Sequence, residues 1–161
     1  GLDGYPKTRV VLLKQYTYEG FIFYTNYNSE KGKAILANPH LCLSFFWPSL
    51  ERQIIIKGIA EKVPANISDG YFESRPLGSQ LGAIVSPQSE VIPSREYLEE
   101  HLHALEKQYE GKEVPRPEHW GGFLVRPQSL EFWQGRPNRL HDRLRYTLTE
   151  DYDWKLERLA P

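Results

Sequence analysis

The chain has 161 residues, the length of one ordinary domain or of one subunit of an oligomer, and we predict a single domain over 1–161. Its 20 basic and 21 acidic residues give a net charge of −1, which argues against a nucleic-acid-binding protein because such a protein carries a basic excess. No apolar run approaches the length that spans a bilayer and no signal-peptide pattern opens the chain, so we expect no membrane partner.

The apolar fraction of 40% and the mean hydropathy of −0.57 describe a soluble chain that can build a core. The single cysteine, Cys42, excludes an internal disulfide bond and fits a reducing, cytoplasmic location. It lies in the apolar run 41–47, and we therefore expect it to be a small buried side chain.

Segments with β-forming composition dominate the first third of the chain. Asp3-Gly4 is a tight-turn signal in front of the first segment, and a hairpin turn needs a preceding strand, so we expect a missing N-terminal segment. Residues 29–38 predict a short helix capped by Asn28 or Ser29 and stopped by Asn38-Pro39. The predicted strands are 9–14, 20–26, 41–47 and 52–63.

Helical signals follow in the middle of the chain. Asn66 is expected to cap a helix that ends at Ser74, and further helices are predicted over 77–85 and 94–110, the last with an apolar stripe. After a Pro-rich linker at 114–117, the predicted strands are 121–126, 129–134 and 154–159. Six or seven strands with few intervening helices predict a mainly β fold, an antiparallel β-barrel with peripheral helices.

Residues 131–143 contain three arginines, a histidine and an aspartate beside Trp133. Guanidinium groups bind phosphate and carboxylate oxygens, and an indole offers a flat face to a conjugated ring. A strand end with a solvated Arg/Asp cluster and a core tryptophan is the alternative interpretation. In either case Asp142 is expected to pair with a neighbouring arginine.

A second candidate set is formed by Tyr71, Arg75 and Ser79, which recur at four-residue spacing and would share one face of a continuous helix. Pro76 interrupts that helix, so we expect two short helical segments. Two hydroxyl groups and a guanidinium converging there could bind a phosphate. A helix surface with capping serines explains the same residues.

The chain has neither a G-x-G-x-x-G pattern nor a P-loop, so donors to a bound phosphate must come from side chains spread along strands. In the first third Arg9, Lys14 and Lys31 are the candidates, with ordinary surface charge as the alternative. Gln53 can both donate and accept, as the pyrimidine edge of a flavin requires, although a solvated glutamine is equally compatible with its position.

Five ordered blocks together resemble the pyridoxamine 5′-phosphate oxidase family over essentially the whole chain. They are Arg-Val-Val-Leu-Leu-Lys at 9–14, Phe-Tyr-Thr-Asn at 23–26, Tyr-Phe-Glu-Ser-Arg-Pro-Leu-Gly-Ser-Gln at 71–80 with Val-Ser-Pro-Gln-Ser at 85–89, Trp-Gly-Gly at 120–122, and 131–143. Arg-Leu-Ala-Pro at 158–161 also ends the chain as family members end. The resemblance implies an FMN-binding split barrel that works as a homodimer with each flavin held between subunits.

The resemblance also implies site residues. Those implied to contact FMN are Arg9, Val10, Val11, Leu12, Lys14, Tyr24, Thr25, Lys31, Gln53, Gln88, Ser89, Trp133 and Arg143, with Gln88 and Ser89 supplied across the dimer. Those implied to bind the substrate are Lys14, Tyr71, Arg75, Ser79, Arg139 and His141, of which Arg139 and His141 lie over the pyridine ring and assist catalysis. No metal site is expected.

The implied reaction is oxidation of pyridoxine or pyridoxamine 5′-phosphate to pyridoxal 5′-phosphate, with O2 reduced to hydrogen peroxide, in vitamin B6 biosynthesis and salvage. A hydride equivalent moves to the flavin, giving the aldehyde from the alcohol, or an imine that hydrolyses from the amine. One position departs from the family pattern, which commonly has Ser-Arg-Lys where this chain has Ser29-Glu30-Lys31. A carboxylate beside a phosphate is expected to weaken FMN binding unless Glu30 turns outward.

Two other functions are compatible with the same sequence. A split-barrel protein that binds FMN or pyridoxal phosphate without turnover is one, since a fold alone does not fix function. A purely structural dimerisation domain is the other, and it leaves the clustered arginines unexplained. All six residues implied to bind the substrate are present, which favours the oxidase.

Overall fold

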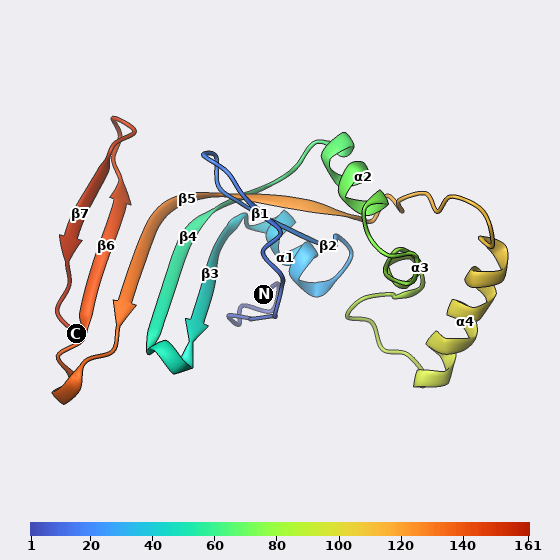
Figure 1. The fold of residues 1–161 in the computed structure, drawn as a ribbon, viewed down its shortest axis with the longest axis horizontal. Coiled ribbons are helices and arrows are strands. Elements are labelled where there is room, and N and C mark those ends of the chain that lie inside the picture. The colour runs from blue at the N-terminus through green and yellow to red at the C-terminus, as the bar shows by residue number, and fades with distance from the viewer.

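The computed structural model describes residues 1–161 as a curled antiparallel sheet, with the helices of residues 65–108 gathered at one end (Figure 1). The strands are β1 (Gln15–Tyr16), β2 (Phe21–Asn26), β3 (His40–Trp47), β4 (Arg52–Lys62), β5 (Trp120–Gln134), β6 (Asp142–Leu148) and β7 (Trp154–Arg158). The helices are α1 (Glu30–Ala37), α2 (Ala65–Glu73), α3 (Leu77–Val85) and α4 (Arg95–Gln108), with 3-10 turns η1 (Pro48–Leu50) and η2 (Pro137–Arg139). The predicted mainly β, antiparallel split-barrel fold is confirmed.

Strand β5 organises the sheet. Its first half pairs with β2 and its second half with β6, while β4 pairs with it along the opposite edge. The sequence predicted two strands here, and that prediction was wrong. The ladder shifts register where Lys57 and Gly58 oppose Ser129 and Pro127, so the residue between them bulges and β5 continues through the proline.

Two other strand predictions were also wrong. Residues 9–14 are not paired as a strand, and only Lys14 donates its backbone N–H to the Ile22 carbonyl before the short β1 begins. Strand β6 was not predicted, because its charged residues conceal a period of two. Arg143, Arg145 and Thr147 lie on one face of it, and the apolar residues between them lie on the other.

The helix predictions hold in outline. Ser29 caps α1 by accepting from the Gly32 N–H, and Ser94 caps α4 by accepting from the Tyr97 N–H. Helix α2 starts after Pro64 rather than at Asn66, because proline suits the start of a helix, where no N–H is needed. The chain breaks between α2 and α3 at Pro76, as predicted.

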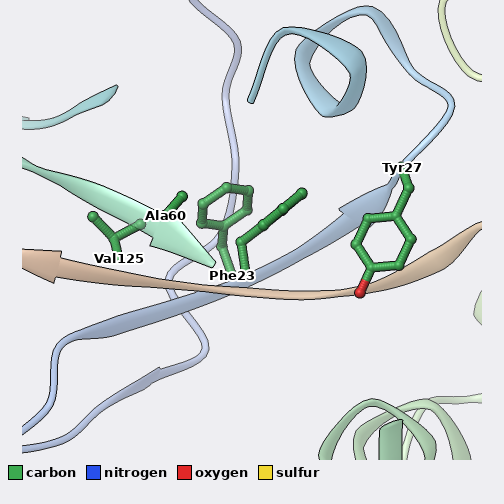
Figure 2. Packing of buried hydrophobic residues seen from close by; sticks show 5 residues of the cluster. Phe23, Tyr27, Ala60 and Val125 are labelled. Atoms are coloured by element: carbon green, nitrogen blue, oxygen red, sulfur yellow. The ribbon is translucent and has the colours of Figure 1, made fainter. Parts of the chain in front are cut away.

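The core lies against β2, β5 and β4, which are neighbours in the sheet, and Figure 2 shows its centre. Phe23 and Phe123 pack with centroids 5.8 Å apart, and the Tyr27 ring meets Phe123 edge-on at 5.2 Å. A second cluster of Phe72, Leu81, Val114 and Trp120 fastens the helices to the start of β5. Gly121 has to lack a side chain, because a Cβ there would collide with the Tyr27 ring.

Cys42 is exposed on β3, so the expectation of a buried thiol was wrong. Strand β3 is an edge strand of the sheet, and alternate residues of it, Cys42 and Ser44 among them, face away from the core. None of the helices combines the length and apolar character that a membrane crossing needs.

Candidate active site

Two arginines differ from all the others in their hydrogen bonding. Every arginine except Arg75 and Arg139 donates from its side chain to a protein acceptor. Asp142, for example, accepts from Arg136 at 2.8 Å and from Arg158 at 2.6 Å, as the sequence predicted. Arg75 and Arg139 both belong to the residues implied to bind the substrate, and both keep their donors available.

The Arg75 guanidinium lies over two aromatic rings at the junction of α2 and α3. Its central carbon is 4.6 Å from the Trp120 ring centroid and 5.9 Å from that of Phe72. One terminal nitrogen, Nη1, is buried without an acceptor, and burial lowers the pKa of the group, which Tyr71 partly opposes. A buried donor without a partner is costly, so an anionic ligand at this position would be stabilised.

An aromatic stack fixes the surroundings of Arg75. Tyr24 stacks on Tyr71 at 3.9 Å and on Trp120 at 5.5 Å between ring centroids. The Lys14 ammonium lies 5.8 Å from the Tyr71 ring centroid. Lys14 before β1, Tyr71 in α2 and Arg75 after α2 thus lie around one aromatic stack of β2 and β5. Their binding of a substrate phosphate stays a prediction.

Ser79 belongs to the same predicted set, but its side chain makes none of the stacking or cation–π contacts that the other three make. It lies in the first turn of α3, exposed, and its hydroxyl makes no hydrogen bond within the chain. Trp120 was not predicted as part of the site, although Trp-Gly-Gly was recognised as a motif. A tryptophan directly before two glycines at a strand start was the available signal.

A second polar cluster lies on the opposite face of β2, because consecutive strand residues point to opposite sides. The Lys31 ammonium donates to Thr25 Oγ1 at 2.9 Å and to Gln88 Oε1 at 2.7 Å. Burial lowers the pKa of Lys31 below its ordinary 10.5, and the charge of Arg9 lowers it further. The cluster therefore holds a partly buried cation that no carboxylate contacts.

Gln88 reaches this cluster within its own chain, since the loop after α3 folds back over β2. The fold of the chain itself therefore places Gln88 beside Lys31, and its implied contact with a flavin across the dimer stays a prediction. Ser89 follows with a left-handed backbone, φ 74°. Of the residues implied to line the flavin near Arg9, Val10 is 97% exposed and Leu12 66%, whereas Val11 packs against the core.

Glu30 does not turn outward. It faces the cations of the N-terminal segment. Its carboxylate accepts from Lys7 Nζ and, at 3.3 Å, from Arg9 Nη2. These contacts lower the pKa of Glu30, with Lys7 as the larger cause. The carboxylate is therefore neutralised where it lies.

The remaining predicted residues lie at the far end of β5. Gln53 pairs with Trp133 across β4 and β5, and the His141 ring is 4.9 Å from the Trp133 ring. His141 Nδ1 accepts from the Arg136 N–H at 3.1 Å, which leaves Nε2 to carry the proton of the neutral ring. Arg143 is engaged with Glu131 at 2.7 Å.

Arg139 is exposed on the turn η2, which has an unusual backbone. Asn138 and Arg139 have φ angles of 58° and 62°, in the left-handed region that side chains rarely adopt. Such residues cost about 1–3 kcal/mol each and cluster at functional sites. The turn presents Arg139 beyond the strand end, close in sequence to the Trp133–His141 pair.

The two groups of residues are far apart within one chain. The 15 residues of β5 span roughly 45–50 Å at about 3.3 Å per residue. Trp120, beside Arg75, is at the start of that strand, and Trp133 is near its end, on the side that carries β6 and β7 (Figure 1). A molecule of flavin size cannot contact both ends of β5 in one chain.

Comparison with known proteins decides the family. The profile described as pyridoxamine 5′-phosphate oxidase matches residues 1–109, and the profile of the pyridoxine 5′-phosphate oxidase C-terminal dimerisation region matches 120–161. The chain belongs to the pyridoxamine 5′-phosphate oxidase family. No group of three or more histidine, cysteine, aspartate or glutamate side chains is arranged to hold a metal ion.

Relatives in this family cover the whole chain. The pyridoxine/pyridoxamine 5′-phosphate oxidase of Flavobacterium psychrophilum is 71% identical over 161 residues, which is 100% of this chain and 75% of the relative. The protein of the same name from Nostoc sp. is 54% identical over 159 residues, 99% of this chain and 74% of the relative.

Solved structures agree on the fold. PhzG from Burkholderia lata, in complex with tetrahydrophenazine-1-carboxylic acid, matches with a TM-score of 0.91 and 30% identity, over 99% of this chain and 77% of PhzG. A pyridoxamine 5′-phosphate oxidase-related, FMN-binding protein from Nostoc punctiforme matches with a TM-score of 0.75 over 99% of this chain and 82% of its own. At 14% identity, that second likeness shows the fold alone.

Replacing Trp120 with phenylalanine should weaken binding of a phosphate ester without unfolding this family member. The smaller ring still fills most of the core site but supports the Arg75 guanidinium less, since tryptophan is the best partner for a cation. We expect KM for pyridoxine 5′-phosphate to rise about three- to tenfold, a change of about 1 kcal/mol. Trp47→Phe on β3, outside the candidate site, is the matched control, and an equal rise in both variants would contradict the role of Trp120.

The pH dependence of flavin binding should report the titration of Lys31. A phosphate dianion favours the charged ammonium, so affinity for FMN should fall as pH rises through the lowered pKa of Lys31, beginning below 10.5. Fluorescence titrations between pH 7 and 10 measure this, above the phosphate's own pKa of about 6. In Lys31→Arg the decline should disappear, because guanidinium stays charged; an identical decline in both proteins would exclude Lys31.

Proposed function

We propose that this chain is an FMN-dependent oxidase that converts pyridoxine or pyridoxamine 5′-phosphate to pyridoxal 5′-phosphate. The alcohol and O2 give the aldehyde and hydrogen peroxide; the amine, O2 and water give the aldehyde, ammonia and hydrogen peroxide. The observation that carries the proposal is that Arg75 and Arg139, alone among the arginines, keep all their side-chain donors available. The names and 54–71% identities of the relatives support the same reaction.

The donor sets fit two phosphorylated molecules. Lys31, Thr25 and Gln88 offer donors on one face of β2, while Lys14, Tyr71 and Arg75 offer them on the other. We assign the first set to the phosphate end of FMN and the second, with Ser79, to the substrate phosphate. When bound, FMN accepts a hydride equivalent from the substrate carbon and passes the electrons to O2.

At the far end of β5, the chain's own groups position the substrate ring. Trp133 offers a flat face, and His141 is held beside it by the Arg136 N–H. Arg139, on its strained turn, orients the ring and would stabilise the charge that develops on the acceptor during transfer. Gln53 and Arg143 complete the flavin contacts. Arg143 already holds Glu131, so we expect it to order the strand end while it contacts the flavin.

The length of β5 supports a shared active site. We infer that one protomer supplies the Lys31 and Arg75 end and its partner supplies the Trp133 and Arg139 end. An open apolar cavity of about 570 Å³ on β5, β6 and β7 supports this arrangement, since exposed apolar patches mark interaction surfaces. Its lining residues are Leu130, Phe132, Leu144, Tyr146 and Trp154, all inside the segment that matches the dimerisation region.

The visible absorption spectrum tests the proposed function directly. Purified protein with FMN should show a bound-flavin spectrum that bleaches when pyridoxine 5′-phosphate is added without oxygen. Admitting air should restore the spectrum and produce one peroxide per aldehyde. Flavin that binds and stays oxidised would favour the non-catalytic binder, and absence of flavin binding would refute the assignment.

Removing the Arg139 guanidinium should separate catalysis from flavin binding. We expect Arg139→Ala to lower turnover about a hundredfold, as loss of one charge-stabilising donor does, with flavin content unchanged. Arg136→Ala in the same turn is the matched control, because Arg136 is occupied by Asp142. Steady-state kinetics and flavin absorbance measure the two quantities; parallel loss of both in Arg139→Ala would remove its substrate role.

A further inference from the structure

Beside the Lys31 cluster lies a pocket of about 320 Å³ whose charged residues have no assigned function. Gln88 and Ser89 form one side of it, and the N-terminal segment forms the other. Its lining residues are Leu2, Asp3, Lys7, Glu30, Lys33, Gln88 and Ser89. Gln88 also contacts Lys31, so this pocket adjoins the proposed phosphate end of the flavin site.

An ion network holds Lys7 in the pocket. Its ammonium contacts Glu30 Oε1 and lies 2.8 Å from Asp3 Oδ2. The two carboxylates raise the pKa of Lys7, Asp3 more than Glu30, so the ammonium stays charged. Glu30 is the first residue of α1 and its position is fixed by the helix, whereas Lys7 belongs to an unpaired extended segment. The fixed carboxylate therefore determines where the flexible ammonium lies.

The charges around the pocket favour a dianion. Four cations, Lys7, Arg9, Lys31 and Lys33, surround two carboxylates, Asp3 and Glu30, which leaves two positive charges. A phosphate monoester carries nearly two negative charges at neutral pH. The start of α1 adds the positive end of a helix dipole on the same side.

We propose that Lys7, positioned by Glu30, is a further cation that binds the phosphate of FMN in this chain. The inference rests on the proposed function, because it concerns the same flavin site. Lys7 supplies the charge that Glu30 would otherwise remove, and Glu30 acts as a positioning residue. An ammonium has three donors and a flexible stem, so Lys7 can keep Glu30 and still donate to a phosphate oxygen.

Flavin affinities of four proteins test this role: the unaltered chain, Lys7→Gln, Glu30→Gln and the double variant, titrated with FMN by quenching of flavin fluorescence. We expect Lys7→Gln to weaken FMN binding about tenfold, the effect of one charge-assisted hydrogen bond. The double variant should stay as weak as Lys7→Gln. Recovery of the original affinity in the double variant would show that Lys7 only shields Glu30, which would overturn the proposal.

Riboflavin, which lacks the phosphate, provides the second readout. Its affinity should be the same in all four proteins, since none of the substitutions touches the ring site. An equal loss of FMN and riboflavin binding in Lys7→Gln would place the effect outside the phosphate and refute the inference. Lys107→Gln on the exposed face of α4 is the matched control. Failure of the unaltered chain to bind FMN would instead refute the proposed function.

Discussion

The continuity of β5 is the constraint on which the structure depends. One edge of this strand pairs with β2 along its first half and with β6 along its second, while β4 pairs with the other edge from Phe123 to Gln134. The bulge opposite Lys57 and Gly58 lets the strand bend without breaking. The same length that builds the curled sheet also carries Trp120 and Trp133 to opposite ends, and this separation is the reason for proposing an active site shared by two chains.

The arginines fall into two groups, those whose side-chain donors are paired with acceptors in the chain and those whose donors are not. Arg143 and Arg116 hold carboxylates across strands or between helix and loop, and they stabilise structure. Arg75 is held by aromatic faces, which fix its position without consuming its hydrogen bonds. Contact with the Phe72 and Trp120 rings thus holds a partly buried guanidinium in place and leaves its donors available for an anion.

Most of the helices and strands could be predicted from the sequence. The cap of α1, the start of α4 near Ser94 and the break at Pro76 depend on local signals, so the sequence placed each of them within one residue of its position. Residues 9–14 were mistaken for a strand because pairing depends on a neighbour that local composition does not reveal. Strand β6 was missed because cross-strand ion pairs such as Arg145–Glu157 place charge inside a sheet, where a pattern-based prediction expects apolar residues.

For the candidate site, too, the sequence could not predict which residues lie next to one another in space. The resemblance identified single residues, but which of them share a pocket depends on strand alternation and on how the loop after α3 returns. Tyr24 and Thr25 are adjacent in sequence and serve different faces of β2, one with Tyr71 and the other with Lys31. Glu30 shows why a departure from a family pattern has to be judged in space. A carboxylate that looks repulsive in a linear comparison is surrounded by cations from a distant segment, and the net charge around it, rather than its own, determines whether a phosphate can bind.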